Sequence, residues 1–456
     1  MVSDSHPVTL YDHWAGVGRH GSVALDSVEL WTVELPFRAP VRTARGVHRT
    51  RPVVLVHLIG ATLDAAGTAT AAIDGWGECA ALADPTFDPE DVERSLAVLR
   101  HVLVPALLAG TDRPGAALPA GRLLPPPSGI EELHLASPHA PLAFAALEMA
   151  VADAHLRAEG RSLAGLLGVE GHRVEIGAVV GQADPADRLL GAVGTLVDEG
   201  YRRIKLKIGP HHDLDPVSLI RSAFPDLLLQ VDANGSYAPG DEAEPTVPAG
   251  PDVSADAAAP TDVHDPADFG DLADRSDVRR LMSLDPFGLL CIEQPFERSE
   301  LAAHAQLASR MATPICLDES LDSPGAVDRA LELGACSVVC VKPSRLGGLG
   351  AALTVIDRCT GAGVPLWMGG MFESGYARGV LTVLGALGGM AWPGDLSPAR
   401  TYLEDDLVPQ VRPTRDGPEG SLVVVLPSGP GMGPPPEPAA LARLGTSHQV
   451  IGVARD

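Results

Sequence analysis

The chain of 456 residues has a globular composition, with 45% hydrophobic, 20% charged and only 4% aromatic residues, and its formal net charge is −25. This length suits one large barrel domain with a smaller companion, and the charge argues against a nucleic-acid partner, because phosphate binding needs a basic surface. The six cysteines form no CxxC pair, no apolar run reaches the ~20 residues that span a bilayer, and the chain start has no signal-peptide pattern. We therefore expect a cytoplasmic protein with reduced thiols and no membrane partner.

The N-terminal third is predicted to form a small α+β domain over residues 26–160. Residues 1–25 show no periodicity and are predicted to be a flexible extension. A polar loop, Thr43–Arg51, separates the first two of three strand-like runs. These runs lie at residues 28–35, 52–59 and 75–79.

Two segments of this domain have apolar residues at helical spacing. They predict helices at residues 88–108 and 141–158. The many Pro and Gly residues of segment 110–135 predict an exposed excursion between them.

From residue 172 to residue 400, short apolar runs alternate with helical segments. This alternation predicts a (β/α) barrel of the TIM type. Seven runs are predicted to be buried parallel strands, at residues 174–180, 203–208, 227–231, 289–292, 313–317, 337–341 and 365–368. Residues 239–273 are acidic and rich in Pro and Ala, which predicts a disordered insertion. Residues 401–456 are predicted to return to the small domain through a strand at 421–426.

Charged and polar residues stand at the ends of five of these runs. In a barrel, the carboxyl ends of the parallel strands meet at one mouth, which holds the active site. Successive ends are about one β/α unit apart, except across the acidic insertion. The residues are Lys205, Lys207, Asp232, Asn234, Glu293, Asp318, Glu319 and Lys342.

Three of these residues, Asp232, Glu293 and Asp318, place carboxylates on adjacent strand ends, which suits a hard cation such as Mg²⁺. The lysines on either side provide acid/base groups on opposite faces of a bound carboxylate. The metal would stabilise the charge that develops when the α-proton leaves. Each motif alone also has a structural explanation, such as a solvated strand end or a helix N-cap. Five such ends in order favour catalysis.

The order KxK, DAN, EQP, DES and K resembles the muconate-lactonizing branch of the enolase superfamily, over about residues 28–433 without the insertions. Further segments resemble the o-succinylbenzoate synthase/N-succinylamino acid racemase subfamily. They are GWGECAALADP at 75–85, KPSRLGG at 342–348, MGGMFESGYAR at 368–378, PGDLS at 393–397 and PSGPGMG at 427–433.

The resemblance implies a modified TIM barrel under an α+β capping domain, with Mg²⁺ as cofactor and Mn²⁺ as a substitute. Lys207 would be the base and then the acid, while Lys342 would stabilise an enediolate or act as the second base. The metal ligands would be Asp232, Glu293 and Asp318, supported by Glu319.

The resemblance also implies a set of contacts to a small-molecule carboxylate. Lys205 would neutralise the substrate carboxylate, and the loop Thr43–Arg51 would close over the site. The remaining substrate contacts would be Asn234, Gly369, Gly370 and Met371.

The implied activity is that of o-succinylbenzoate synthase, a carbon–oxygen lyase of menaquinone biosynthesis. It performs the Mg²⁺-dependent syn dehydration of 2-succinyl-6-hydroxy-2,4-cyclohexadiene-1-carboxylate to 2-succinylbenzoate. One alternative is an N-succinyl- or N-acylamino acid racemase that uses the same two lysines. A second is a non-catalytic binding or scaffold protein, against which the intact lysines and carboxylates argue. Family members commonly assemble, so the resemblance allows a homo-oligomer, but the residues themselves do not fix the oligomeric state.

Four positions depart from the family pattern. Cys340 stands where the family usually has Asn, and Ser344 and Ala377 each stand where it usually has Gly. Val179 stands where a small polar residue is expected near the substrate. These departures spare the metal ligands and lysines, so they bear on substrate choice.

Overall fold

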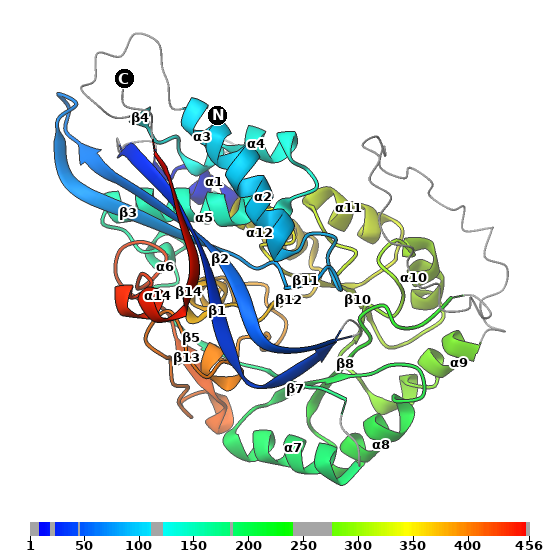
Figure 1. The fold of residues 1–456 in the computed structure, drawn as a ribbon. Helices are drawn as coiled ribbons and strands as arrows, with labels where there is room; N and C mark the ends of the chain where they lie inside the picture. The colour runs from blue at the N-terminus through cyan, green and yellow to red at the C-terminus, as the bar shows by residue number, and fades with distance from the viewer. Residues whose placement is uncertain are drawn as a thin grey trace, which may run out of the picture.

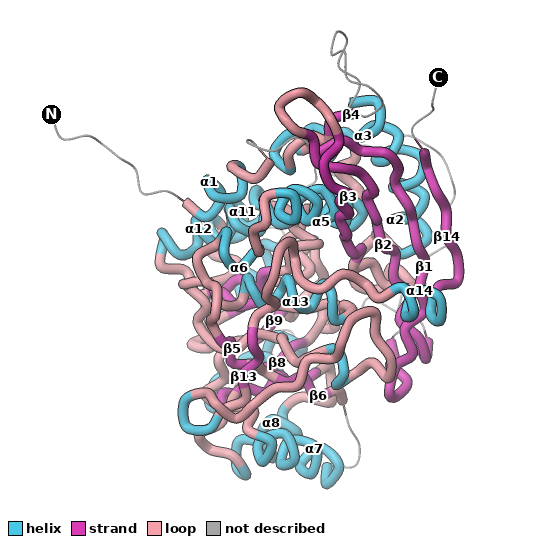
Figure 2. The backbone as a smooth tube through the Cα atoms, turned by 90° about the vertical axis from the view of Figure 1, so that its left-hand side faces the viewer, coloured by secondary structure: helices cyan, strands magenta, loops and turns pink. Residues whose placement is uncertain are grey.

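A computed structural model of the chain describes residues 9–18, 23–43, 46–110, 122–182, 186–239 and 276–452. These residues form an antiparallel sheet with helices, which we call the cap, and a curled parallel sheet ringed by helices (Figure 1). The long strands of the cap cross in front of the barrel in Figure 1, and the turned view of Figure 2 shows them along one side of it. The predicted fold class, a modified barrel with an α+β cap, is confirmed. No described helix combines the length and apolar character needed to cross a bilayer.

The cap sheet has the strand order β14-β1-β2-β3, with the short β4 paired to β1. The three predicted strands are present but longer than predicted. Their bounds, with those of their partners, are β1 (Val23–Thr43), β2 (Gly46–Leu63), β3 (Ala69–Cys79), β4 (Arg122–Leu123) and β14 (Gly445–Gly452).

The predicted polar loop Thr43–Arg51 is instead the end of a β-hairpin. β1 and β2 resume pairing after a register shift between Pro36 and Val41, and the ladder continues to the pair Thr43↔Gly46. Residues 44–45 lie outside the described residues. The loop prediction was wrong because the segment is almost entirely polar, with Val47 as its one large apolar residue after Gly46, so it has no alternation of apolar and polar residues to reveal a strand.

Helix α5 (Pro141–Ala158) covers one face of the cap sheet, with the bounds predicted from its apolar residues. Two glycines of β3 let the helix approach closely. A Cβ at Gly77 would lie 1.9 Å from the carbonyl oxygen of Ala146, and one at Gly75 would lie 2.3 Å from that of Ala150. The backbone of β3 therefore rests directly on the helix.

The helix predicted at 88–108 is divided by a π-helical turn into α2 (Val92–Val98), η1 (Leu99–Leu103) and α3 (Val104–Gly110). Residues 111–121 of the predicted excursion lie outside the described residues. The remaining cap helices are η2 (Pro127–Gly129) and α4 (Glu131–Ala136).

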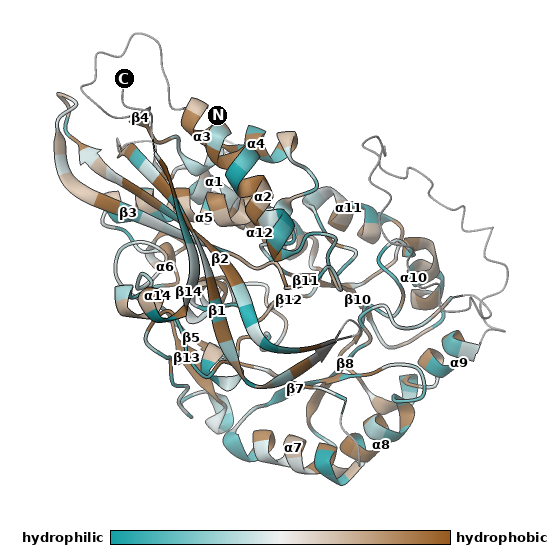
Figure 3. Cartoon of the chain, viewed as in Figure 1, coloured by the Kyte–Doolittle hydropathy of each residue, from teal (hydrophilic) through white to brown (hydrophobic). Residues whose placement is uncertain are grey.

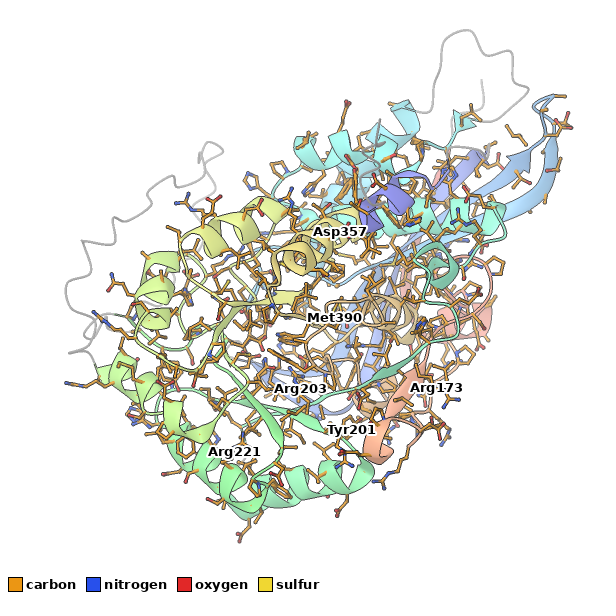
Figure 4. All side chains as sticks on the ribbon, turned by 180° about the vertical axis from the view of Figure 1, so that it is seen from behind. Arg173, Tyr201, Arg203, Arg221, Asp357 and Met390 are labelled. Atoms are coloured by element: carbon orange, nitrogen blue, oxygen red, sulfur yellow. The ribbon has the colours of Figure 1, made fainter. Side chains whose placement is uncertain are left out.

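The predicted flexible extension contains an ordered helix, α1 (Leu10–Ala15), which packs against α12 (Leu349–Ala362). The backbone N–H groups of Leu10 and Tyr11 donate to the carboxylate of Asp357 on α12, at 3.2 and 3.0 Å (Figure 4). Trp14 is fully buried. The prediction for residues 1–25 was wrong over residues 9–18, because one turn and a half of helix is too short to show periodicity, and over residues 23–25, which begin β1.

The seven predicted barrel strands form one parallel sheet in chain order. The first run, 174–180, is divided between β5 and β6. The strands are β6 (Ala178–Val180), β7 (Arg203–Lys207), β8 (Leu228–Asp232), β9 (Ile292–Glu293), β10 (Ile315–Leu317), β11 (Val338–Val341) and β12 (Leu366–Met368).

An irregular segment at residues 390–395 fills the eighth place of the ring. It pairs in parallel with β12 through the bridge Leu366↔Met390 and with the chain before β6 through the bridge Ile176↔Gly394. Met390 is labelled in the view from behind (Figure 4). The barrel thus has eight places, one of them held by non-strand backbone.

Helices surround the barrel, and in Figure 3 those of the outer ring, such as α7 and α8, carry both hydrophilic and hydrophobic residues, as expected of helices with one buried face. They are α6 (Leu163–Leu166), α7 (Ala186–Glu199), α8 (Leu214–Ala223), α9 (Ser276–Met282), η5 (Asp285–Phe287), α10 (Leu301–Ala308), α11 (Pro324–Glu332), α12, α13 (Gly375–Leu384), η6 (Ala399–Thr401) and η7 (Pro418–Gly420). The last helix, α14 (Pro438–Leu444), packs against β1 and β14 of the cap. The acidic insertion predicted at 239–273 lies outside the described residues, apart from Pro239.

The C-terminal segment differs from the prediction. The strand predicted at 421–426 is β13 (Val423–Val425), and it pairs with β5 (Arg173–Glu175) beside the barrel instead of joining the cap. The strand that returns to the cap is β14, which pairs with the edge of β1. Its sequence, GTSHQVIG, is mostly polar and exposed, so it gave no strand signal.

Candidate active site

The carboxyl ends of β7, β8 and β9 bring lysines and carboxylates into one register. Lys207 is paired with Asp232 across the β7–β8 ladder, and Asp232 with Glu293 across β8–β9. Lys205 lies two residues before Lys207 and so points to the same side of the sheet, into the barrel. The sequence predicted this meeting of residues, and the parallel register produces it.

Lys207 is the more open of the two lysines on β7, with 32% of its side chain exposed. Its ammonium donates to Asp232 Oδ2 at 2.7 Å and to Asn234 Oδ1 at 2.6 Å. Asn234 in turn donates through Nδ2 to Glu319 Oε1 at 2.8 Å. Asn234 adopts a left-handed conformation, with φ of 45°, just after the strand. This turn aims its amide oxygen at the lysine.

Lys205 is buried and surrounded by acids. Its ammonium lies 3.0 Å from Glu293 Oε2, 3.1 Å from Asp232 Oδ2 and 2.7 Å from Asp395 Oδ2. Burial by itself would lower the pKa of Lys205, but Asp395, Glu293 and Asp232 together raise it well above its usual value. Lys205 therefore carries a fixed positive charge at the base of the site.

Lys342, at the end of β11, is less exposed than Lys207. Only 12% of its side chain is exposed, and its ammonium donates to Asp318 Oδ2 at 2.7 Å. Burial opposes its charge, but Asp318 raises the pKa of Lys342 above its usual range. Arg345 binds the other oxygen of Asp318 and also forms two bonds with Asp88 of the cap, at 2.8 and 3.0 Å.

Of the three predicted metal ligands, only Glu293 lies where its negative charge is disfavoured. Burial, followed by repulsion from Asp232, raises the pKa of Glu293 to about 8. Burial opposes the ionisation of Asp232 and Asp318 as well, but Lys207 and Lys205 lower the pKa of Asp232, and Arg345 and Lys342 lower that of Asp318. A divalent cation among these oxygens would relieve the repulsion at Glu293, so the residues fit a hard cation such as Mg²⁺.

The carboxylates do not all lie equally close to one another. Potential ligand atoms of Glu293, Asp318 and Cys340 lie within 4.8 Å of one another, and all three residues are buried. The Asp232 carboxylate is not in this group, and both lysines of β7 bind it.

Lys207 and Lys342 lie on opposite sides of the barrel. The ring order β6-β7-β8-β9-β10-β11-β12, completed by residues 390–395, puts four steps between β7 and β11 in either direction. The two ammonium groups therefore approach the mouth from opposite walls. A flat carboxylate-bearing substrate between them would offer one face to each lysine.

The chain uses lysine nowhere else. Lys205, Lys207 and Lys342 are the only lysines in the sequence, whereas Lys and Arg together number 34. Arginine cannot lose its proton in a protein, but lysine can. Lysine is thus confined to the one place where proton transfer would need it.

Glycines and the cap complete the mouth after β12. A Cβ at Gly369 would lie 2.6 Å from Cys340 Sγ and 2.9 Å from Lys342 Cε, and one at Gly370 would lie 2.6 Å from Nη1 of Arg378. Met371, predicted to line the pocket, is only 5% exposed and packs in the apolar core of the cap. Gly369 thus leaves room for the Lys342 side chain.

The cap binds the segment that follows β12, residues 369–374, through Glu78 of β3. Its carboxylate accepts from the backbone N–H of Ser374 at 2.9 Å and from the Ser374 hydroxyl. Phe372 packs edge-on against Phe37 of β1, with ring centroids 5.7 Å apart. The mouth is therefore built from both parts of the chain.

Several contributing residues were missed by the sequence analysis. Asp395 binds Lys205 and Arg203, and Gln230 donates to Glu293 Oε2 at 2.7 Å. Arg203, labelled in Figure 4, is fully buried in the barrel. Asp395 and Arg345 lie in the segments PGDLS and KPSRLGG, which the sequence analysis singled out, but the residues of those segments do not predict which side chains these two would bind.

The departures from the family pattern fall in different places. Val179 is paired with Lys205 across β6–β7 and is 43% exposed, so it faces the mouth. Cys340 and Ala377 are buried, and Ser344 is partly exposed.

Residues 189–440 match the family described as Enolase C-terminal domain-like. The chain is 38% identical to an N-succinylamino acid racemase from Amycolatopsis over 94% of this chain and 99% of that protein. It is 34% identical to an N-succinylamino acid racemase from Thermus thermophilus over 90% and 94% of the two chains. With an o-succinylbenzoate synthase from Geobacillus kaustophilus it shares 32% identity over 90% and 93% of the two chains.

Solved structures show the same fold. A member of the enolase superfamily from Listeria innocua superposes with a TM-score of 0.77 at 27% identity, over 94% of this chain and all of that one. A probable mandelate racemase from Alicyclobacillus acidocaldarius gives a TM-score of 0.75 at 31% identity, over 94% and 98% of the two chains.

Proposed function

The chain belongs to the enolase superfamily, and from this premise we propose that it transfers the α-proton of a small carboxylate between Lys207 and Lys342, as an N-acylamino acid racemase. The observation that carries the proposal is the placement of the only three lysines of the chain at one barrel mouth, two of them on opposite walls. Racemisation removes a proton from one face of a carbon and returns one to the other face, so it needs both walls.

The other site residues support this assignment. The fixed charge of Lys205 lies beneath Asp232 and Glu293 and offsets part of their repulsion. A divalent cation held by Asp232, Glu293 and Asp318 would supply positive charge next to the substrate carboxylate. The two outer lysines, Lys207 and Lys342, each make an ion pair of 2.7 Å with one of these carboxylates. Both ammonium groups are therefore positioned within one hydrogen bond of the metal ligands.

A second candidate is o-succinylbenzoate synthase, the activity that the sequence analysis placed first. Syn dehydration takes a proton and returns it to the leaving hydroxyl on one face, so a single lysine can serve both steps. Lys207 is the more open of the two outer lysines, which favours it for that role. The relatives named above include both activities at 32–38% identity.

The test uses purified protein with Mg²⁺ and two substrates. Racemisation of each enantiomer of an N-succinylamino acid is followed by optical rotation and by deuterium exchange at the α-carbon. Dehydration of the cyclohexadiene precursor of 2-succinylbenzoate is followed by absorbance. The variants Lys207→Ala and Lys342→Ala are compared with Arg310→Ala, a surface arginine.

The two candidates predict different outcomes. A racemase loses racemisation in both lysine variants and keeps it in Arg310→Ala. A synthase loses dehydration in Lys207→Ala and shows no racemisation. Absence of exchange and of dehydration in the unaltered protein would overturn both candidates.

A further inference from the structure

Cys340 places a sulfur atom at the level of the metal ligands. Cys316 of β10 is paired with Val338 of β11, and Asp318 and Cys340 each follow two residues later. Asp318 and Cys340 therefore lie side by side on neighbouring strands and point to the same side, into the barrel. Both are at most 2% exposed.

The Cys340 thiol has room at this position and no competing partner among the described residues. Gly369, which directly follows β12, has no side chain, and a Cβ there would lie only 2.6 Å from Cys340 Sγ. The thiol of Cys316, one level below, instead accepts a hydrogen bond from Trp367 Nε1 at 3.4 Å. Cys340 is therefore the better placed of the two thiols to bind a ligand at the mouth.

The ligand atoms of Glu293, Asp318 and Cys340 lie within 4.8 Å of one another, which suits a single ion. The set predicted to bind Mg²⁺, Asp232 with Glu293 and Asp318, offers oxygen alone. The set that the structure gathers shares Glu293 and Asp318 with it and has the Cys340 sulfur in place of an Asp232 oxygen. Oxygen donors suit Mg²⁺, whereas thiolate favours Zn²⁺ and other thiophilic ions.

We propose that Glu293, Asp318 and Cys340 form a second, thiophilic cation site that shares two carboxylates with the Mg²⁺ site, so that Zn²⁺ or Cd²⁺ displaces Mg²⁺ and inhibits the enzyme. On binding, the Cys340 S–H bond breaks, its proton leaves to solvent, and the sulfur donates the freed electron pair to the cation. The inference rests on the metal site of the proposed function but not on its substrate.

The test adds Cd²⁺ alone to the metal-free protein and follows the thiolate-to-cadmium absorption in the near ultraviolet. We expect one equivalent of Cd²⁺ to produce the band in the unaltered protein. Cys340→Ser should lose the band and bind Cd²⁺ on the order of 100-fold more weakly. The same variant should bind Mg²⁺ with little change. Because the two ions share Glu293 and Asp318, Mg²⁺ should lower the apparent Cd²⁺ affinity of the unaltered protein. Cys316→Ser, which removes a neighbouring buried thiol, is the matched control and should keep the band.

Circular dichroism of each variant and Mg²⁺ titration establish that the site is intact, with Cys340→Ala as a second variant if Cys340→Ser fails to fold. A band that survives in the Cys340 variants, or a Cd²⁺ affinity that Mg²⁺ does not lower, overturns the proposal. A normal Cd²⁺ band beside silent substrate assays would leave this site standing and overturn the proposed function, and active substrate assays without the band would do the reverse.

Discussion

The two walls of the barrel mouth carry similar groups in different surroundings. On the β7 wall, Lys207 binds one carboxylate and one neutral amide and keeps 32% of its side chain exposed. On the β11 wall, Lys342 is 12% exposed and shares Asp318 with Arg345, which is tied to the cap through Asp88. The difference teaches that one lysine is open to solvent and bound only within the barrel, while the partner of the other is anchored by ion pairs that reach the cap.

The largest effect is expected from replacing either lysine by arginine. Lys207→Arg and Lys342→Arg keep the charge but remove the ability to take up a proton, so α-proton exchange should fall by about 10²- to 10⁴-fold. Exchange is measured in D₂O from each enantiomer of an N-succinylamino acid. If the walls act separately, each variant blocks exchange mainly from one enantiomer, and equal loss from both would contradict that separation.

The next effect concerns the anchor of the β11 wall. Asp88→Asn leaves Arg345 without its partner in the cap and should lower the free energy of unfolding by about 3–5 kcal/mol, as expected when one member of a buried ion pair is removed. Urea unfolding measures the change. Asp322→Asn, which removes the exposed pair with Arg298, should cost about 1 kcal/mol or less. Equal losses in the two variants would show that Asp88 contributes no more than a surface charge.

A pH effect is expected from Glu293, which lies between the walls. Its pKa is raised to about 8 by burial and Asp232, so the metal-free native state binds a proton that the unfolded state releases above its ordinary pKa of 4.5. Native stability should therefore fall as pH rises from about 4.5 to 8. Glu293→Gln removes this loss.

Thermal unfolding of metal-free protein checks the effect of Glu293. The melting temperature of Glu293→Gln minus that of the unaltered protein should grow over this pH range. A difference that stays constant with pH would mean that the pKa of Glu293 is not raised in the folded protein. Saturating Mg²⁺ should abolish the pH dependence in the unaltered protein.

The smallest effect is expected at the neutral partner of Lys207. Asn234→Ala removes one hydrogen bond, worth about 1 kcal/mol, which corresponds to roughly a fivefold change in rate. Exchange should slow on the Lys207 side and remain unchanged on the Lys342 side. A loss as large as that of Lys207→Arg would instead assign Asn234 to the chemistry.

Strong local patterns in the sequence were sufficient for much of the fold. The helix Pro141–Ala158 was predicted with its observed bounds, and each of the seven apolar runs overlaps a barrel strand, although the first run also includes β5. Segments whose order depends on distant partners were missed. α1 is held by Asp357, about 350 residues away, and β14 pairs with β1 from the opposite end of the chain. Neither has a local pattern strong enough to indicate its structure.

By itself, the sequence determined which groups can carry the chemistry, since three lysines and three carboxylates at strand ends must meet wherever parallel strands close into a barrel. Tertiary structure alone decided how those groups are held. Asp395 and Arg345 bind residues at least 27 positions away, and ring order sets Lys207 and Lys342 on opposite walls. The physical reason is that ion pairs and pKa shifts depend on distance and burial in space, which spacing along the chain does not fix.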